Sequence, residues 1–543
     1  MADAQAIASG LLAHWKLCGD AKDSSGNGND GVSRDVDFSA AGPNGKPHTG
    51  ARFGGRSSYI QVGADRSFRL GTGEFSLAAW VHTEPELDDV LGSIAGQYDP
   101  QARRGFTLSL KNHAGMTSSQ SNYRNLQFGI DNGQSDGTWE DCGRPGHSVF
   151  IFSMAVHDGQ LFVGTCEPGD GDAGHVYRYG GSGRWIDCGS PDPCNAVSSL
   201  AEYDGKLYAG VSRYHLPHSG QPASTNEHPG GKVYRYEGDG NWADCGRLGE
   251  SVALHGMAVY RGKLYVTSMY APAGVFRYDG DHNWVSVGTP DGKRVEALGV
   301  YDGHLYGTGY DYGFICRYEG GTNWAIVGEP PDTTQTYAFA VYEGSHYVST
   351  WPTATVYRIN GDHDLTDCGR IGQEREAMGM AIYNGKLYVG SLPLAEVYRY
   401  EGDRYWTRLK RLDFTPEVIY RRAWTMAVFQ GRLFIGTLPS GHIHALEVGK
   451  NATYDRALEP GWRHVAAVRG SDALRLYVDG ALVATTPTLP AAEYDIANES
   501  PFYLGFGDHD YFNGILSDVR LYGRALTEAD VSALYRRRES VGQ

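Results

Sequence analysis

Long hydrophobic runs are missing from this sequence of 543 residues. No stretch of about 18 apolar residues occurs, so we expect no helix that inserts into a membrane. The first residues, Met1–Ala4, lack the basic region and apolar core of a secretory signal. We therefore expect a secreted or periplasmic protein whose signal has been removed, and a cytoplasmic location stays open.

Positive charge and cysteine are also scarce. The chain has 48 Lys and Arg against 64 Asp and Glu, a net charge of −16, which argues against nucleic acid as a partner. Its 8 cysteines are too few for a disulfide scaffold, and no Cys-x-x-Cys pair indicates zinc. A pairing of Cys166 with Cys194 stays open. Gly-x-Ser-x-Gly, phosphate-loop and His-Glu-x-x-His motifs are absent, which excludes the enzyme classes they define.

Glycine and aromatic residues, by contrast, are abundant, with 74 Gly, 36 Tyr and 11 Trp. This balance is typical of an all-β protein with many tight turns. The middle of the chain also repeats one pattern, which residues 154–164 represent: two apolar runs around an Asp-Gly turn, a β-hairpin signal. The turn glycines of the copies are Gly159, Gly205, Gly262, Gly303, Gly344, Gly385 and Gly431.

A strand such as Val176–Tyr179 follows each hairpin, and a tryptophan strand follows most of these. Each unit therefore holds four short strands in about 40–50 residues, the pattern of a β-propeller blade. Seven hairpins predict seven blades. The last unit lacks a tryptophan strand, whereas a spare one around Trp139 precedes the first hairpin. We expect this strand to complete the seventh blade and close the ring, because open sheet edges are a liability.

The flanks of the repeat alternate apolar and polar residues, as half-buried antiparallel strands do. Examples are Leu12–Leu17 and Phe75–Val81 before the repeat, and Leu474–Gly480 and Gly514–Tyr522 after it. Together these runs resemble the laminin-G-like, concanavalin-A-like jelly-roll family of bacterial carbohydrate-active proteins. The resemblance implies a jelly-roll β-sandwich, in two halves at 1–133 and 451–543, into which a propeller at 134–450 is inserted.

Members of this family often hold a structural calcium ion near the first turn and the last strand. The resemblance thus implies a Ca²⁺ site, because calcium prefers several hard oxygen ligands. The matching positions are Asp23, Asn27, Asn29 and Asp518. The alternative is a solvated turn, in which Asn, Asp and Gly are common anyway. Residues 508–511 are a weaker candidate, and we expect them to form an exposed loop.

Ligand sites of propellers lie over the central channel, so residues that break the repeat at that mouth are the candidates. They stand where each first strand begins or each second strand ends, and the long loop from Arg213 to Gly231 belongs to this set. The candidates for catalysis are His215, His255, Tyr310 and Tyr337. The candidates for substrate binding are Arg213, Tyr214, Tyr270, Glu296, Trp351, Glu376, Arg422 and Trp424.

Three functions fit these side chains, all with a polysaccharide or glycan as partner. The first is a polysaccharide lyase that cleaves a uronic-acid-containing polymer by β-elimination, with an Arg on the carboxylate and His and Tyr moving protons. Several seven-bladed polysaccharide lyases are similar in this use of Arg, His and Tyr. The second is a non-catalytic lectin or scaffold. The third is a glycoside hydrolase with Glu296 and Glu376 as its carboxylate pair.

Overall fold

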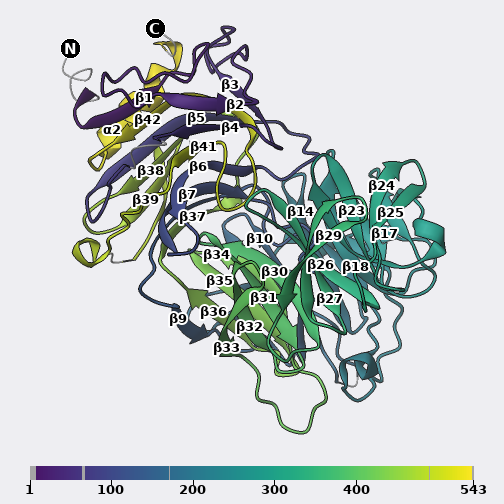
Figure 1. Ribbon diagram of the computed structural model, residues 1–543. Coiled ribbons are helices and arrows are strands. Elements are labelled where there is room, and N and C mark those ends of the chain that lie inside the picture. Colours follow the sequence, from purple (N-terminus) through teal and green to yellow (C-terminus); the bar gives the residue numbers. More distant parts are fainter. Residues whose placement is uncertain (1–7, 64–67, 170, 488–489, 541–543) are drawn as a thin grey trace.

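The computed structural model describes residues 8–63, 68–169, 171–487 and 490–540, and β-strands dominate them, which confirms the all-β prediction. Two bodies lie side by side in Figure 1: a sandwich built from both ends of the chain, in purple and yellow, and a propeller-like body from the middle, in teal and green. The α-helix α2 (Glu528–Arg536) has a capping box between Thr527 and Asp530. No helix in these ranges is long and apolar enough to cross a membrane. The 3-10 turns are η1 (Leu216–Ser219), η2 (Pro290–Gly292), η3 (Ala491–Glu493) and η4 (Arg537–Ser540).

The sandwich consists of two seven-stranded antiparallel sheets, and each takes strands from both ends of the chain. The first sheet contains β1 (Leu11–Trp15), β42 (Asn513–Tyr522), β5 (Phe75–Thr83), β38 (Gly461–Arg469), β39 (Leu474–Val478) and β40 (Ala481–Thr485), with β3 (Ala51–Gly54) beside β42. The second contains β2 (Gly31–Arg34), β4 (Tyr59–Val62), β41 (Phe502–Leu504), β6 (Gly92–Asp99), β7 (Arg104–Lys111), β8 (Asn125–Asn132) and β37 (Lys450–Ala457).

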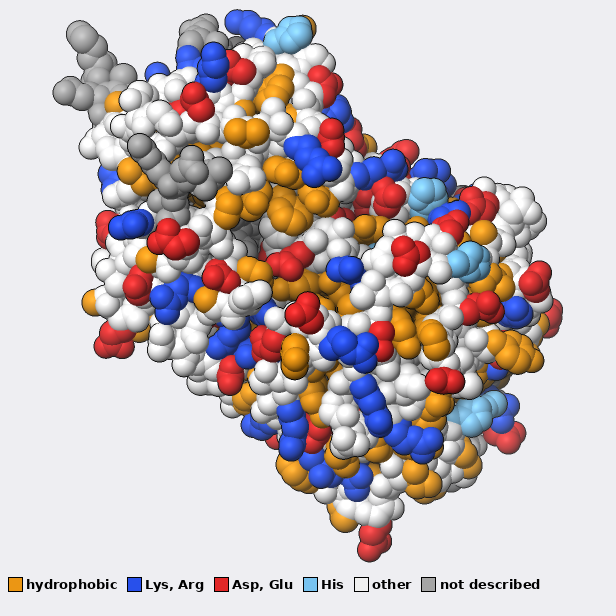
Figure 2. All heavy atoms as spheres, viewed as in Figure 1, with side chains coloured by type: hydrophobic (Ala, Val, Ile, Leu, Met, Phe, Trp, Pro, Cys, Tyr) orange, Lys and Arg blue, Asp and Glu red, His pale blue; other side chains and the backbone are white. Residues whose placement is uncertain are grey.

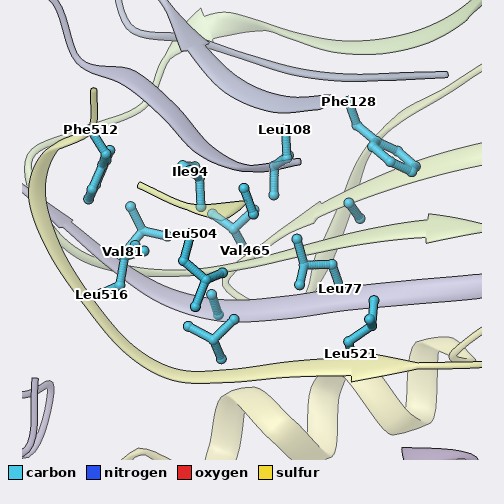
Figure 3. Close-up of a cluster of buried hydrophobic side chains, with 14 of the residues drawn as sticks. Leu77, Val81, Ile94, Leu108, Phe128, Val465, Leu504, Phe512, Leu516 and Leu521 are labelled. Atoms are coloured by element: carbon cyan, nitrogen blue, oxygen red, sulfur yellow. The ribbon is translucent and has the colours of Figure 1, made fainter. Parts of the chain in front are cut away.

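One hydrophobic core joins the two sheets. Leu77 and Leu516 come from the first sheet, Leu108 and Phe128 from the second, and all four are almost fully buried. Figure 3 shows that these side chains point toward one another between the layers. Because residues far apart in the chain share this core, neither half of the sandwich can bury its apolar face alone.

The middle of the chain forms five four-stranded antiparallel sheets and one eight-stranded sheet. The five are β18 (Leu254–Tyr260), β19 (Lys263–Ser268), β20 (Val275–Tyr278) and β21 (Trp284–Ser286); β22 (Val295–Tyr301), β23 (His304–Gly309), β24 (Ile315–Gly320) and β25 (Asn323–Gly328); β26 (Gln335–Tyr342), β27 (Ser345–Trp351), β28 (Thr355–Gly361) and β29 (Asp364–Arg370); β30 (Glu376–Tyr383), β31 (Lys386–Leu392), β32 (Glu396–Gly402) and β33 (Tyr405–Arg411); β34 (Arg422–Phe429), β35 (Arg432–Leu438), β36 (Ile443–Glu447) and β9 (Thr138–Asp141).

The eight-stranded sheet is two groups of four strands that meet at one bridge, between Cys166 and Ala196. Its members are β10 (Phe150–His157), β11 (Gln160–Cys166), β12 (Val176–Tyr179), β13 (Trp185–Asp187), β14 (Ala196–Tyr203), β15 (Lys206–Ser212), β16 (Lys232–Gly238) and β17 (Asn241–Arg247). The inner strands β10, β14, β18, β22, β26, β30 and β34 contact one another in this order, and β34 contacts β10. The arrangement is therefore a closed, propeller-like ring.

The strand around Trp139 pairs where the sequence predicted. β9 runs antiparallel to β36, with Trp139 opposite Leu446, and so completes the sheet that begins with β34. Residues about 300 positions apart thus close the ring, which leaves this sheet without the bare edge at β36.

Two hydrogen bonds recur between neighbouring units, and they explain why Trp and Tyr repeat. In five of the fourth strands the indole Nε1 donates to a backbone carbonyl of the preceding unit at 2.8–2.9 Å: Trp185 to Cys142, Trp242 to Cys188, Trp284 to Cys245, Trp324 to Val287 and Trp406 to Cys368. The last tyrosine of an inner strand donates to the turn glycine of the next unit: Tyr203 to Gly262, Tyr260 to Gly303, Tyr301 to Gly344, Tyr342 to Gly385 and Tyr383 to Gly431.

A loop of the sandwich fills the centre of the ring. This plug loop, residues 112–124 between β7 and β8, is buried except at Tyr123. Its backbone and side chains bond the inner strands: the Phe339 N–H donates to the Gly115 carbonyl at 2.9 Å, and the Val259 N–H donates to Gln120 Oε1 at 2.7 Å. Asn122 bonds both the N–H and the carbonyl of Val428. Polar side chains in the loop therefore satisfy inner-strand groups that no neighbouring strand pairs.

The segment 508–511 is not the exposed loop that we expected. Asp508, His509 and Asp510 are buried between the sandwich and the propeller-like body. Asp508 pairs with the buried Lys111 at 2.7 Å, and His509 Nδ1 lies 2.8 Å from the Val341 carbonyl oxygen. The prediction was wrong because polarity suggested solvent, whereas these groups satisfy one another at a junction. On the outer surface in Figure 2, acidic and basic side chains are interspersed over both bodies.

Candidate functional site

A cavity of about 240 Å³ opens where the inner strands begin, at the end of the ring opposite the Asp-Gly turns. Elements from all around the ring contribute to it. The lining residues are Phe152, Tyr214, His218, His255, Met269, Tyr270, Glu296, Tyr310, Gln335, Tyr337, Trp351, Glu376, Leu392, Tyr420, Arg422 and Trp424.

The register of the inner strands explains this lining. Alternate residues of a strand share one face, so positions two and four before the first residue of each hairpin motif point the same way. The residues two positions before the hairpin motif that line the cavity are Phe152, His255, Glu296, Tyr337 and Trp424. The residues four positions before the hairpin motif that line the cavity are Gln335, Glu376 and Arg422. The repeat stays constant inside the sheets and varies at these positions, which is where polar side chains enter the cavity.

His255 and Glu296 form one side of the cavity. His255 Nε2 lies 3.6 Å from Glu296 Oε1, and both side chains are buried. Burial lowers the pKa of His255 to about 4, so the imidazole is neutral at pH 7. Burial, with the nearby charge of Glu376, raises the pKa of Glu296 well above its usual range. Neither His255 Nε2 nor Glu296 Oε2 has a hydrogen-bond partner among the described residues.

Glu376, Arg422 and Tyr337 occupy the other side. Burial raises the pKa of Glu376 to about 7, although the Arg422 charge and the Tyr337 hydroxyl act in the opposite direction. Arg422 lies 5.5 Å from the ring centre of Tyr420 and 5.9 Å from that of Trp424. Its Nε and Nη1 are buried and have no hydrogen-bond partner within the described part of the chain. Such donors are costly to bury unless a ligand uses them.

Aromatic side chains form the walls. Trp351 carries the Arg375 guanidinium 4.9 Å above its ring, and Tyr270 stacks on His215 with ring centres 4.5 Å apart. Tyr214, in the loop after β15, is held because its N–H donates to Asn195 Oδ1 and its carbonyl accepts from Asn195 Nδ2. Flat rings and hydrogen-bonding tips of this kind suit the apolar faces and hydroxyl groups of a sugar.

The plug loop lies beneath the cavity. Ser118 Oγ donates to the Phe152 carbonyl oxygen at 2.9 Å, and Trp424 Nε1 donates to the same oxygen at 3.0 Å. Phe152 and Trp424 both line the cavity, so a loop of the sandwich supports the cavity floor.

The structure brings together all but two of the predicted mouth residues. Arg213 and His215 are not in the lining: Arg213 lies 3.6 Å from Glu227, and His215 is exposed behind Tyr270. The sequence placed His218 at the mouth only as part of the long loop, and it did not indicate Phe152, Met269, Gln335, Leu392 and Tyr420, which also line the cavity. Counting two and four positions back from each hairpin motif would have found Phe152 and Gln335. All eight cysteines are free, including Cys166 and Cys194.

The candidate calcium residues lie around the first turn and the last strand of the sandwich, and N–H groups engage the carboxylate oxygens of Asp23 and Asp518. Asp23 accepts hydrogen bonds from the backbone N–H groups of His14, Ser25 and Asn29 at 2.8–2.9 Å. Asp518 lies 2.6 Å from His14 Nε2 and 2.9 Å from Arg520 Nη2. The side-chain amides of Asn27 and Asn29 donate to the Leu12 carbonyl. No cluster of three or more His, Cys, Asp or Glu that could hold a metal occurs in the described ranges.

Comparison with known proteins adds one family. Residues 420–532 match the family model of the concanavalin A-like lectin/glucanases superfamily. No curated protein matches the chain. Among solved structures, virginiamycin B lyase from Staphylococcus aureus is similar with a TM-score of 0.45 and 12% identity, over 58% of this chain and 100% of its own. Trypanosoma rangeli sialidase is similar with a TM-score of 0.28 and 12% identity, over 74% of this chain and 95% of its own.

Proposed function

We propose that this protein is a polysaccharide lyase that cleaves a uronic-acid-containing polysaccharide by β-elimination in the mouth cavity. One observation supports this most directly. Arg422 and His255 place unpartnered, buried hydrogen-bonding nitrogens in a cavity that the Tyr337 hydroxyl also lines. These are the donor, base and acid that such a reaction needs.

The roles follow from the chemistry of each group. Arg422 donates charge-assisted hydrogen bonds to the uronate carboxylate, which makes the C5 proton more acidic. His255 Nε2 takes that proton, and the electron pair forms the double bond between C4 and C5. The C4–O bond breaks, and the Tyr337 hydroxyl gives its proton to the departing oxygen. Burial keeps the pKa of Tyr337 well above its usual range, so the proton is present at neutral pH. Tyr310 is the alternative acid.

The two buried glutamates, Glu296 and Glu376, are compatible with an anionic substrate when they are protonated. An ionised pair beside the substrate would repel its carboxylate, whereas burial favours the neutral acids. Below pH about 7, Glu376 can therefore donate a hydrogen bond to the carboxylate.

A direct experiment is to incubate the protein with a panel of acidic polysaccharides and follow the ultraviolet absorbance of unsaturated uronate. The expected result is a rise in absorbance with at least one polymer, and its loss in Arg422→Met. New reducing ends without this absorbance would indicate hydrolysis instead. Binding with neither product would indicate the lectin or scaffold alternative.

Glycoside hydrolysis is the second candidate, because Glu296 and Glu376 are two carboxyl groups with raised pKa values in one cavity. The variant Glu376→Gln separates the two mechanisms. Under elimination, the glutamine still donates a hydrogen bond and activity falls less than about tenfold at pH 6. Under hydrolysis, the lost acid or base lowers kcat by about a hundredfold or more.

We also propose the finer architecture that the sequence predicted. In this view the eight-stranded sheet counts as two blades of a seven-bladed propeller, 134–450, which is inserted between the halves 1–133 and 451–543 of a jelly roll. The single bridge within that sheet and the mixed origin of both sandwich sheets support this view. Residues 1–133 expressed alone should fail to give a dispersed amide spectrum, since half of their core is missing.

Structural calcium at Asp23, Asn27, Asn29 and Asp518 remains a proposal from the family resemblance. A calcium ion would have to displace the N–H donors that now engage Asp23 and the Arg520 guanidinium beside Asp518. If the site exists, calcium raises Tm in the wild type but not in Asp23→Ala. Equal Tm values with calcium and with chelator would exclude it. A secreted or periplasmic location is likewise a proposal, which fractionation of the source cells can test.

A further inference from the structure

We propose that the mouth cavity accepts a single uronate residue at the reducing end of a chain, so that the enzyme releases unsaturated monosaccharides from that end. This inference rests on the proposed lyase function, which it makes more specific. Three features of the cavity carry it: its floor, its size and its single cation.

The floor is closed, so a polymer cannot thread through the ring. The plug loop occupies the channel below the cavity, and Ser118 and Trp424 both bond the Phe152 carbonyl. Deeper in the channel, Gly115 and Asn122 bond the inner strands at Phe339 and Val428. A sugar chain can therefore enter and leave only through the mouth.

The size fits one ring. The cavity holds about 240 Å³, which is below the ~300–1,000 Å³ of pockets that bury a drug-sized ligand. The loop after β15 narrows the mouth further, because His215 and His218 pack on Tyr270. One sugar ring can therefore lie within the walls, while its neighbours in the chain remain outside.

The charge fits one carboxylate. Arg422 is the only Lys or Arg in the lining described here. Arg213 and Arg294, in nearby loops, already pair with Glu227 and Asp311. A second uronate ring would thus find no further cation within the lining, because the exposed Arg375 lies outside it, stacked on Trp351.

The chemistry of elimination then fixes the direction. The residue that becomes unsaturated carries the carboxylate at C5 and loses the sugar attached to its O4. That sugar and the rest of the chain must leave through the mouth. The C1 side of the bound ring faces the closed end, where no further residue can follow. The bound uronate is therefore the last residue at the reducing end.

The test uses uronate trisaccharides prepared from the acidic polysaccharides of the panel. Each native trisaccharide is compared with the same trisaccharide after borohydride reduction, which opens the ring at its reducing end. We expect the first product of the native form to be an unsaturated monosaccharide, and reduction to lower kcat/KM by about tenfold or more. A trisaccharide methylated at O4 of the opposite end serves as the control and should react within about twofold of the native form. Early release of unsaturated oligosaccharides of mixed length from a polymer would overturn the inference while leaving the lyase function intact.

Binding of the same compounds by calorimetry keeps the two proposals separable. If no unsaturated product forms, the lyase proposal fails. The inference on chain-end binding still stands if native trisaccharides bind about tenfold more tightly than reduced ones and Arg422→Met removes this preference. Equal binding of both forms, or binding of neither, overturns it.

Discussion

The two ends of the inner strands differ in how their polar groups are satisfied. At the end with the Asp-Gly turns, tyrosine hydroxyls such as those of Tyr260 and Tyr383 bond the next turn glycine, and the plug loop bonds the strands themselves. At the mouth, His255, Glu296 and Arg422 are as deeply buried and keep atoms without partners beside a cavity of about 240 Å³. At the turn end, both ring nitrogens of His346 also lack partners within the described ranges, but the space beside them is only about 10 Å³. The difference indicates that the turn end maintains the ring, whereas the mouth end is prepared for a ligand that supplies the missing partners.

The largest expected contrast between the two ends is in catalysis. Tyr337→Phe removes one hydroxyl at the mouth and should lower kcat by about a hundredfold or more, because the leaving oxygen loses its proton donor. The matched change at the turn end, Tyr260→Phe, removes the hydrogen bond to Gly303. It should lower stability by about 1 kcal/mol and leave kcat unchanged. Rates of elimination and thermal melts of both variants test this contrast. Equal losses of activity in the two variants would contradict a catalytic role that is confined to the mouth.

The second contrast concerns pH and stability. The folded protein holds the Glu376 proton more tightly than the unfolded chain, because burial raises its pKa from 4.5 to about 7. This stabilisation is complete below pH 4.5 and is lost as the pH rises to about 7, a change of up to about 3 kcal/mol. Glu376→Gln cannot titrate, so its stability relative to wild type should rise over this window. Urea unfolding at several pH values measures it, with the exposed Glu250→Gln as a control that should follow the wild type.

The third contrast is in the plug loop. Asn122→Ala removes both hydrogen bonds to the Val428 backbone and should lower the free energy of unfolding by about 2 kcal/mol, since buried backbone groups lose their partners. Chemical denaturation measures the loss. If the free energy of unfolding falls no more than for a substitution at an exposed position, the plug loop contributes little to the stability of the ring.

The smallest expected effect is at an arginine that recurs in the units. Arg277 forms a partly exposed ion pair with Asp279 at 2.7 Å. Pairs of this kind contribute at most about 1 kcal/mol, so Arg277→Ala should change Tm little and leave elimination intact. A large loss of activity would place function away from the mouth.

Much of the fold could be predicted because the hairpin motif recurs at nearly regular intervals along the sequence. The turn glycines and tryptophans marked the hairpins, and the spare Trp139 strand indicated the closure that β9 and β36 make. The plug loop could not be predicted in this way. Residues 112–124 are rich in Ser, Asn and Gln, which is typical of an exposed loop. They are buried because the inner strands surround them and bond their polar groups.

The mouth was predictable for a related reason. Residues such as His255, Glu296 and Arg422 break an apolar repeat at fixed distances from the hairpin motif, so the register brings them to one face. The long loop after β15 has no such register. Its Arg213 and His215 therefore could not be placed from sequence, and neither reaches the cavity lining.

Elimination at the mouth is tested most directly by the mass spectrum of the product formed in heavy-oxygen water. β-Elimination adds no water, so cleavage should give an unsaturated product and leave the original bridging oxygen, not heavy oxygen, on the departing fragment. Tyr337→Phe should lower the yield of the unsaturated product. Cleavage that gives only saturated products, with one heavy oxygen from water at the new reducing end, would show hydrolysis and contradict the lyase mechanism.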